Sequence, residues 1–435
     1  MIEDKSTALS TAQLERVYQR NFFFFLSDGI LFTVAMGVIG GTTVIPDFVR
    51  RLTDSEILIG LSGSLFEIGW TLPQLFIARY IIRFAHKKWW FVGPNIPVRF
   101  VMLAFGVLTM LLGKDHPETI LLLFFISYGI ASVGDGIVGV PWADLVGTSL
   151  GAHWRARMFG LMSATAGVIM LLISPLISVV LGDAGPAFPN NYAILFIVAG
   201  LLFVLSNIPT LFIRELPGGK PVEKLPGLGE FLPDLGRVLR TDASFRAIII
   251  TRMLTTLLAM AGPFYIGFAT TQLRLSSDVA VPTLLAMQTI GGVSGALIYA
   301  WLGARNNVLF IRLALLGAAF LPISALLAVQ FGPVPLYFGF LMSGLTLSNL
   351  FLSYQNYVIS HATPDRRPVY AGLFNTISAI TSLTAPFIAG TIVAQLGYEV
   401  LFVTALVMAF LALFVTVRYL QNSRTAPQPI AAAAD

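Results

Sequence analysis

Long apolar stretches separated by short polar segments dominate this chain. An α-helix needs about 20 mostly apolar residues to cross the hydrocarbon core of a bilayer. Twelve stretches have this character, and they lie at about 21–45, 57–80, 92–113, 118–142, 157–181, 191–213, 246–271, 279–302, 308–330, 333–359, 368–395 and 398–419. Gly and Pro interrupt many of them, which helices in lipid tolerate when neighbouring helices satisfy the freed backbone groups. The pattern predicts an all-α membrane protein with twelve transmembrane helices, not a barrel of short alternating strands.

The composition agrees with this pattern. The chain is 56% hydrophobic and 11% charged, whereas soluble domains are about a quarter charged. It contains no cysteine, which excludes disulfides, thiolate catalysis and metals held by cysteine. The sequence has neither an HExxH zinc motif nor a GxxxxGK[ST] nucleotide-binding motif. An ATP-driven pump is therefore disfavoured, and an ion gradient is the expected energy source.

The basic residues are distributed unevenly between the two sides of the predicted bundle. With both termini cytoplasmic, only four of the 27 Lys and Arg residues fall in outside loops, while Arg99 and Arg252 fall within spans. Lys and Arg concentrate in the cytoplasmic loops of membrane proteins. The net charge of +5 therefore reflects membrane orientation and not a nucleic-acid partner. We expect a multi-pass protein of the plasma (inner) membrane with both termini in the cytoplasm.

The chain divides into two halves of similar pattern. The longest polar stretch is rich in Pro and Gly and separates the sixth span from the seventh. "HWRARMFGL" follows the fourth span and "PDRRPVYAGLF" follows the tenth, and each precedes a proline within the next span, Pro175 or Pro386. Such self-similarity indicates an internal repeat. The expected organisation is a cytoplasmic N-terminal segment at 1–20, a six-helix bundle at 21–213, a cytoplasmic central loop at 214–245, a second six-helix bundle at 246–420 and a disordered cytoplasmic tail at 421–435. Within the first segment, Ser10 and Gln13 have the spacing of a capping box, which predicts a short interfacial helix.

In these features the chain resembles the major facilitator superfamily (MFS) of transporters. The shared features are two groups of six spans, a long central loop, basic loops after spans 2 and 8, and an Arg-rich loop after span 4. The loop after span 2, "LPQLFIARYIIRFAHKK", has the family's basic cluster but lacks the aspartate that normally precedes it. The fifth span lacks the glycines of the family's antiporter pattern. The resemblance implies the MFS fold, in which two six-helix bundles, each built from inverted three-helix repeats, rock about a site at the middle of the membrane.

Ionisable residues within the predicted spans are the main candidates for solute binding and proton coupling, namely Asp28, Glu67, Asp135 and Arg252. An ionisable side chain at this depth is costly unless it faces the protein interior, so each one marks a functional site by default. The resemblance implies that spans 1, 4, 7 and 10 line a central water-filled cavity, which would be shared by Asp28, Asp135 and Arg252. Any of the three carboxylates could exchange the coupled proton. Arg252 could bind an anionic solute or, as we expect, serve as the counter-ion of Asp28. Alternatively, the acids only pair with Arg252 or Arg99 and hold the bundles together.

Neutral side chains and loop residues supply further candidates. Asn349, in the polar stretch "SNLFLSYQNYVISH" of span 10, and Gln288 of span 8 could donate hydrogen bonds to a solute; the alternative is hydrogen bonding between helices. The resemblance implies a cytoplasmic gate at the loops, with Asp144 in an ion pair there. The gating candidates are Arg79, Arg83, Asp144, Arg155, Arg157, Arg366 and Arg367.

The sequence thus predicts a transporter and not an enzyme, with no catalytic residue, metal or cofactor. "GLSG" at Gly60 and "SVGD" at Asp135 partly match intramembrane proteases, but neither has the partner residues that such chemistry requires. We expect a monomeric secondary active transporter that moves a small organic solute across the lipid bilayer by alternating access, with protons as the coupling ion. The slight excess of carboxylates over arginines within the spans favours a cationic or zwitterionic amphipathic solute. A non-transporting receptor or scaffold and a gradient-independent uniporter are the alternatives, and the direction of transport stays open.

Overall fold

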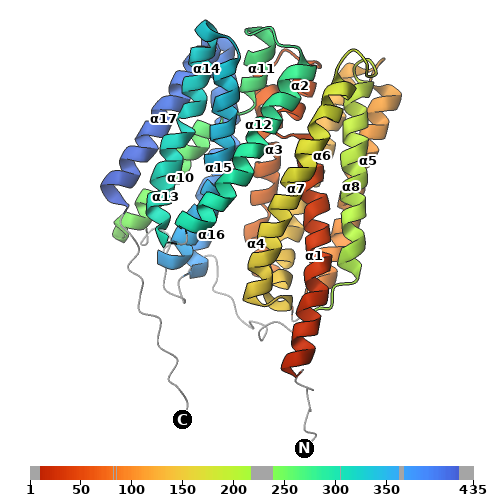
Figure 1. The fold of residues 1–435 in the computed structure, drawn as a ribbon, viewed down its shortest axis with the longest axis vertical. Coiled ribbons are helices and arrows are strands. Elements are labelled where there is room, and N and C mark those ends of the chain that lie inside the picture. The colour runs from red at the N-terminus through yellow and green to blue at the C-terminus, as the bar shows by residue number, and fades with distance from the viewer. Residues whose placement is uncertain are drawn as a thin grey trace, which may run out of the picture.

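A computed structural model describes residues 10–81, 83–84, 86–216, 239–303, 305–361 and 367–420, and the regular elements in these ranges are helices. The N half comprises α1 (Thr11–Ile39), α2 (Val44–Arg50), α3 (Glu56–Thr71), α4 (Gln74–Ile81), α5 (Lys88–Leu112), α6 (Pro117–Ser149), α7 (Ala152–Leu181) and α8 (Asn190–Leu211). The C half comprises α10 (Ala243–Ala259), α11 (Phe264–Thr271), α12 (Ser277–Ile298), the π-helical turn η1 (Tyr299–Gly303), α13 (Asn307–Ala318), α14 (Phe320–Phe331), α15 (Val334–His361), α16 (Arg367–Leu396) and α17 (Tyr398–Tyr419). Figure 1 shows the two halves beside each other. The face where α1 begins and α17 ends is termed the terminal face, and the opposite one the distal face.

Ten helical segments of the described chain are long and apolar enough to cross a membrane. They coincide with ten of the predicted spans. The predicted span 57–80 is divided into α3 and α4 around Pro73, because proline cannot donate the backbone hydrogen bond that would continue α3. The predicted span 333–359 is α15, whose apolar part is the shorter stretch Val334–Leu347. The predicted all-α membrane fold is confirmed, although length and apolarity alone do not reproduce the count of twelve.

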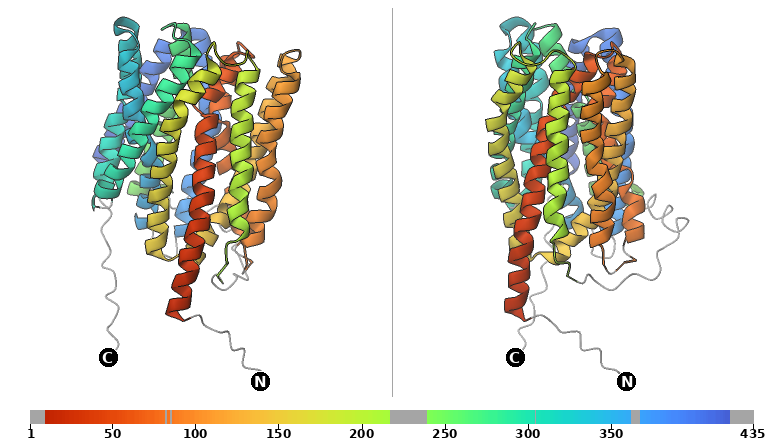
Figure 2. Two further views of the ribbon diagram at one scale, coloured as in Figure 1. Left: turned by 45° about the vertical axis from the view of Figure 1, so that its right-hand side comes forward. Right: turned by 90° about the vertical axis from the view of Figure 1, so that its right-hand side faces the viewer.

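The start of α1 follows the predicted capping box. The Ser10 hydroxyl accepts a hydrogen bond from the backbone N–H of Gln13 at 3.3 Å, and the Gln13 side chain accepts one from the backbone N–H of Ser10 at 2.9 Å. One helix then continues to Ile39. The predicted short interfacial helix is therefore the beginning of α1 itself, which extends beyond the rest of the bundle at the terminal face (Figure 2).

The first and seventh spans are broken at matching places in the two halves. After α1, Gly40 adopts the left-handed backbone conformation with φ 55°, which glycine tolerates because it has no side chain. After α10, Pro263 precedes α11, and proline is favoured at helix starts. The two breaks produce the short helices α2 and α11 at the distal face, where they contact each other. This correspondence agrees with an internal repeat.

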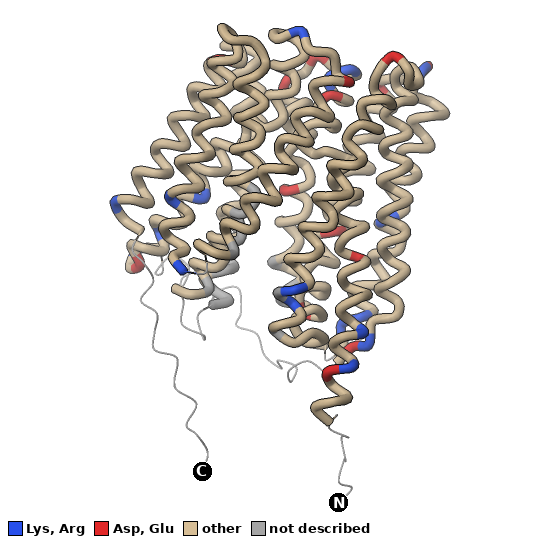
Figure 3. The backbone as a smooth tube through the Cα atoms, viewed as in Figure 1, with Lys and Arg blue, Asp and Glu red and all other residues tan. Residues whose placement is uncertain are grey.

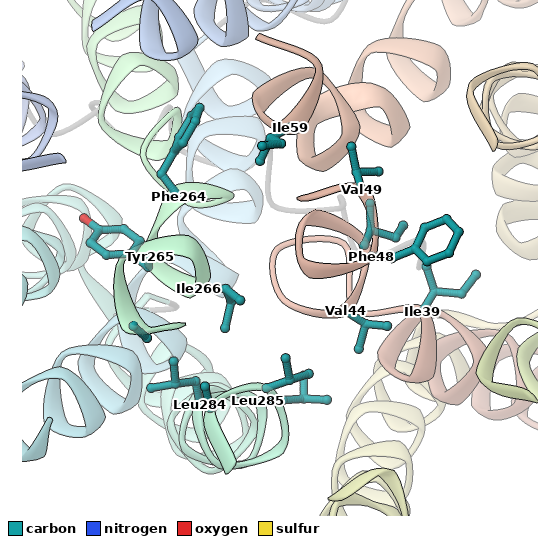
Figure 4. Packing of buried hydrophobic residues seen from close by; sticks show 14 of the residues in the cluster. Ile39, Val44, Phe48, Val49, Ile59, Phe264, Tyr265, Ile266, Leu284 and Leu285 are labelled. Carbon is teal, nitrogen blue, oxygen red and sulfur yellow. The ribbon is translucent and has the colours of Figure 1, made fainter. Parts of the chain in front are cut away.

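Buried apolar residues form three clusters, one that spans both halves and one within each half. The largest joins both halves in the distal part of the molecule and contains Phe48 of α2 and Phe264 of α11 (Figure 4). A second cluster, around Phe25 and Leu145, lies toward the terminal face entirely within the N half. The third, around Phe245, lies toward the terminal face entirely within the C half. Within the described ranges, the two halves therefore share a hydrophobic cluster in their distal part, and each of the other two clusters belongs to one half.

The most extensive helix contacts between the halves are those of α3 with α16 and of α7 with α12. Small residues permit this close approach, as they do in other membrane helices. A Cβ atom added to Gly390 of α16 would lie 2.6 Å from the Cα atom of Ile57 in α3. A Cβ atom added to Gly63 of α3 would lie 2.3 Å from the ring of Pro263. Larger side chains at these glycines would separate the halves.

Charged residues gather toward the two faces of the bundle, and only a few lie in its middle (Figure 3). This distribution follows from the cost of placing charge in hydrocarbon. The few charged residues of the interior are the basis of the candidate site.

Candidate functional site

Arg99 of α5 and Asp135 of α6 form an ion pair in the interior of the N half. Their Nη1 and Oδ1 atoms are 2.8 Å apart, and both residues are buried. The guanidinium also lies over the rings of Phe32 and Phe203, at 4.6 and 5.2 Å from the ring centroids. Such cation–π contacts stabilise a cation where water is scarce. Gly136, beside Asp135, lies where a Cβ atom would be 2.5 Å from a backbone oxygen of α3, so α6 packs tightly against α3 at this depth.

Asp28 of α1 lies near this ion pair and is 4% exposed. Arg99 and Asp135 are the charged groups that act on its carboxyl group, and Trp142 and Ser206 are its hydrogen-bonding neighbours. Among the described residues, Asp28 forms no ion pair of its own. Two carboxyl groups thus lie near one guanidinium, which pairs with Asp135. The group formed by Asp28, Arg99 and Asp135 is termed the acid cluster. It can bind a proton or a small cation.

A second polar group joins the two halves. Arg252 of α10 donates a hydrogen bond to the Oε1 atom of Glu67 of α3 at 2.7 Å, and Ser382 of α16 donates one to the same oxygen at 3.2 Å. The Glu67 side chain is 44% exposed, whereas that of Arg252 is 13% exposed. These three residues are termed the cross-half cluster. Its carboxylate is accessible, while its guanidinium is largely enclosed.

The cross-half cluster corrects one expectation. We expected Arg252 to be the counter-ion of Asp28, but the structure pairs it with Glu67. The reason is the packing of the helices: α3 and α10 both contact α16, which brings Glu67 and Arg252 together at the junction of the halves. Asp28 instead points into the N half, where Arg99 and Asp135 already pair.

The C half supplies hydrogen-bonding groups without charge. Gln288 of α12 lines a cavity of about 260 Å³, to which the N half contributes Thr42. Gln355 donates a hydrogen bond to Asn375 at 3.1 Å, which connects α15 with α16. The side chain of Asn349 lies outside the described residues. Of the two neutral candidates, the structure therefore places Gln288 at a cavity.

The structure places four of the gating candidates at the terminal face, and Asp144 forms an ion pair there. The carboxylate of Asp144 lies 2.7 Å from the Nζ atom of Lys87, just before α5. Arg155 donates to two backbone oxygens at the end of α6 at 2.8 Å. Arg157 lies over two aromatic rings at 5.7 and 5.8 Å from their centroids, and Arg83 is exposed. The remaining candidates have side chains outside the described residues, namely Arg79, Arg366 and Arg367.

Contacts at the distal face were not singled out from the sequence. Arg51, which follows α2, donates a hydrogen bond to the Ser277 hydroxyl of α12 at 2.8 Å. Arg50 pairs with Glu56 at 2.9 Å, and its guanidinium lies 5.8 Å from the ring centroid of Tyr398 of α17. Both arginines thus connect the N half to the C half. Two consecutive arginines directly after a long apolar stretch were the available signal, because such a pair marks the end of a span.

Asp242 organises the terminal face of the C half. It caps α10 by accepting a hydrogen bond from the backbone N–H of Phe245 at 2.9 Å, and its other oxygen accepts one from the Tyr370 hydroxyl at 2.9 Å. The same oxygen lies 2.8 Å from the Nε2 atom of His361. Burial alone would raise the pKa of Asp242, but these hydrogen bonds and the charge of His361 lower that pKa below its ordinary value. Asp242 thereby holds α10, α15 and α16 together.

The fold and the interior charges define a class of protein: a multi-pass helical membrane protein of two half-bundles, with ionisable groups buried in the N half and an ion pair that joins the halves. The model of the Major Facilitator Superfamily matches residues 28–383 and 312–435. The chain belongs to the Major Facilitator Superfamily, and it is a membrane transporter, not an enzyme. The resemblance inferred from the sequence is thereby confirmed.

Individual relatives agree with this membership. A "Quinolone resistance transporter" of Acinetobacter baumannii is 27% identical over 152 residues, which are 35% of this chain and 32% of the relative. The match thus spans about a third of that relative's length. The crystal structure of a mutant of the nucleoside transporter NupG has a TM-score of 0.67 at 14% identity and covers 91% of this chain and 99% of its own. The D-xylose–proton symporter has a TM-score of 0.66 at 13% identity and covers 94% of this chain and 99% of its own. At these identities the structures show the fold alone.

Proposed function

We propose that this transporter is a proton-coupled secondary active carrier that moves a small organic solute by alternating access, with Asp28 as the site of the coupled proton. It acts as a monomer in the plasma (inner) membrane with both termini in the cytoplasm, in line with the distribution of its basic residues. The observation that carries the proposal is the excess of carboxylates in the acid cluster. The names of similar proteins, which include nucleoside, D-xylose and quinolone resistance transporters, support an organic solute.

The charge balance of the interior favours Asp28 over the other two carboxylates as the proton site. Asp135 has Arg99 at 2.8 Å, and Glu67 has Arg252 at 2.7 Å. Asp28 has no such partner among the described residues and is buried. A charged group in this position is costly, whereas a protonated carboxyl group is neutral and can donate a hydrogen bond. Asp28 therefore gains a proton when its surroundings are dry and releases it when water reaches the cluster.

The cross-half cluster is the proposed connection between the solute and the movement of the halves. Its ion pair joins α3 to α10, so it must rearrange when the halves rotate against each other. The Glu67 carboxylate is 44% exposed and can be reached by a solute. A cationic or zwitterionic solute that interacts with Glu67 would weaken the pair with Arg252. Differential contacts of this kind are what allow a ligand to shift a conformational equilibrium.

The packing of the halves supports an alternating-access cycle and suggests the state that the structure represents. The shared hydrophobic cluster lies in the distal part, and each cluster near the terminal face belongs to one half. Hydrogen bonds between the halves also lie at the distal face, where Ser178 of α7 donates to a backbone oxygen of Asp278 at 2.6 Å and Arg51 binds Ser277. Polar and apolar contacts thus close the distal side. We infer a state that opens toward the terminal face.

A ligand screen followed by a flux assay tests the proposal. Purified wild-type protein and Asp28→Asn are screened by thermal shift against a library of organic compounds at pH 5.5 and pH 8. We expect compounds that stabilise the wild type in a pH-dependent manner and stabilise Asp28→Asn equally at both pH values. Hits are then assayed in proteoliposomes with and without a pH gradient, and the gradient should drive accumulation only through the wild type. The matched control is Glu118→Gln, an exposed acid at the distal face, which should behave as wild type.

The alternatives give different results in the same assays. A receptor or scaffold would bind compounds without any flux. A uniporter would equilibrate the compound without responding to the pH gradient. Equal pH dependence in wild type and Asp28→Asn would remove Asp28 as the proton site and leave Glu67 or Asp135.

A further inference from the structure

We propose that the cavity of about 260 Å³ in the distal part of the C half binds an uncharged group of one or two aromatic rings with a single polar substituent, and that this group is the apolar part of the transported solute. That the bound group belongs to the transported solute rests on the proposed function. The binding site itself does not rest on it, because binding can be measured without transport.

The walls of the cavity determine the chemistry of its ligand. Of the described residues that line it, none is charged, and most are aliphatic or small. The polar groups come from Thr42, Tyr265, Gln288 and Ser343. Placing a charged ligand in such surroundings would leave its charge without a partner, which is strongly unfavourable. The site therefore selects an uncharged ligand that is apolar over most of its surface.

The size of the cavity limits the ligand further. An apolar cavity of about 150 Å³ admits benzene, and pockets for drug-sized molecules start at about 300 Å³. A volume of about 260 Å³ lies between these values and matches one or two rings. A larger solute would place only part of itself here, with its polar part outside the cavity.

Tyr265 provides a fixed hydrogen-bonding group at this site. The residue is 2% exposed, and within the described part of the chain its hydroxyl has no hydrogen-bond partner. Its ring stacks on Phe402, with centroids 4.7 Å apart and planes at 2°, and meets the edge of Phe340 at 5.9 Å. Figure 4 shows the ring directed away from Phe48 and the rest of the N half. Since buried hydroxyls are nearly always paired, this fixed and unpaired group indicates a partner supplied by a ligand.

The cavity also lies at a part of the fold that moves in the proposed cycle. Tyr265 belongs to the short helix α11, directly after the break in the seventh span, and Gly262 lies in that break. Thr42 lies in the equivalent break of the first span, and a Cβ atom on Gly262 would be 3.5 Å from its methyl group. The N half thus contributes to the wall at the distal end. A ligand in the cavity would therefore contact both halves.

Three naphthalene derivatives of nearly equal size test the inference: 2-naphthalenemethanol is neutral, 2-naphthoate is an anion, and 2-naphthylmethylamine is a cation at neutral pH. Binding to the full-length purified protein is followed by naphthalene fluorescence. The variants are Tyr265→Phe, which removes only the hydroxyl, and Ala318→Leu, which fills the cavity. The matched control is Tyr419→Phe, an exposed tyrosine at the terminal end of α17. Thermal melting checks that each variant is folded.

We expect saturable binding of 2-naphthalenemethanol to the wild type and to Tyr419→Phe. Loss of one neutral hydrogen bond should weaken binding to Tyr265→Phe about fivefold, and binding to Ala318→Leu should be at least about tenfold weaker. Both charged analogues should bind the wild type at least about tenfold more weakly than the alcohol. Equal binding of the alcohol to the wild type and to Tyr265→Phe would overturn the inference. So would preferred binding of a charged analogue, or the absence of saturable binding, which would mean that water alone fills the cavity.

The two proposals fail in different ways. If the alcohol binds as expected but proteoliposomes do not transport it or related compounds, the cavity assignment holds and the proposed function fails. If another solute shows proton-driven flux but the alcohol does not bind, the proposed function holds and the cavity assignment fails.

Discussion

Glu67 and Arg252 are the residues at which we propose that solute binding is connected to the movement of the halves. Their ion pair is 2.7 Å long and partly exposed, so its net contribution to stability should be modest. We predict that Glu67→Gln and Arg252→Gln each lower the free energy of unfolding by about 1–2 kcal/mol, since each leaves a charge without its partner. The double variant should lose clearly less than the sum of the two, because residues in one polar network are coupled.

A double-mutant cycle of unfolding midpoints in detergent measures this coupling. Asp144 and Lys87, paired at 2.7 Å at the terminal face, provide a matched pair within one half. Strict additivity at Glu67 and Arg252 would mean that their contact does not stabilise the protein.

Asp242 gives a prediction for pH. Because its pKa is lowered in the folded protein, the group adds stability above the ordinary unfolded value of about 3.9, and this stability is lost as the pH falls through the lower folded pKa. Asp242→Asn keeps a good N-cap residue and removes the titration. The wild type should therefore melt at a higher temperature than Asp242→Asn from pH 5 to pH 7, and the difference should shrink as the pH falls below about 4. The control is Asp183→Asn, in an exposed turn. Its melting temperature should differ from that of the wild type by the same amount at every pH. If the melting-temperature difference between the wild type and Asp242→Asn grows as the pH falls, the predicted direction of the pH effect is wrong.

The interior residues show what sequence can and cannot predict at this scale. Asp28, Glu67, Asp135 and Arg252 could be identified because an ionisable residue inside an apolar stretch is conspicuous. Their partners could not be predicted from the sequence. The depth of a residue along a helix follows from residue count, whereas the direction in which its side chain points depends on packing. Arg252 was therefore expected to pair with Asp28 of α1, whereas it pairs with Glu67 of α3, and the gating candidate Asp144 pairs with Lys87.

At the scale of helices, the pair α3 and α16 controls how closely the halves approach. A Cβ atom at Gly390 would lie 2.6 and 2.8 Å from backbone atoms of Ile57, which cannot rotate away. We predict that Gly390→Ala weakens the distal contact. Since the chain has no cysteine, the contact can be measured as the rate of disulfide formation between Arg51→Cys and Ser277→Cys. This rate should fall several-fold in Gly390→Ala and stay unchanged in Gly160→Ala, where a Cβ atom meets nothing within 4 Å. Equal rates of disulfide formation in Gly390→Ala and Gly160→Ala would show that the contact between α3 and α16 does not set the distance between the halves.

The helices themselves were largely predictable from the sequence. Apolar stretches of about 20 residues predict spans because hydrocarbon demands them, and the capping box at Ser10 marks the start of α1. The breaks were harder to predict. Pro73 divides the second predicted span, whereas Pro141 and Pro175 lie inside continuous helices. A proline alone does not say whether neighbouring helices will satisfy the carbonyl group that it leaves unpaired.

At the scale of the whole molecule, the family was predictable from the repeat and the loops, while the closed distal side was not. That closure depends on contacts between residues far apart in the sequence, such as Phe48 with the cluster around Phe264. It also depends on Arg51 and Ser277, which no local pattern connects. The proposed coupling between Asp28 and the movement of the halves likewise involves the whole molecule, and it can be tested without knowing the solute.

The most direct measurement is the distance between spin labels across the terminal face as a function of pH. Labels on cysteines at His153 of α7 and Ser360 of α15, both exposed, are measured by pulsed electron paramagnetic resonance in lipid nanodiscs at pH 5.5 and pH 8. A second pair of labels is placed at Asp115 and Phe331, which are exposed at the distal face. The distance between these two labels should change with pH in the opposite sense. In the wild type the balance between short and long distances should shift with pH, and Asp28→Asn should show the low-pH balance at both values. The same pH shift in Asp28→Asn as in the wild type would contradict proton coupling through Asp28.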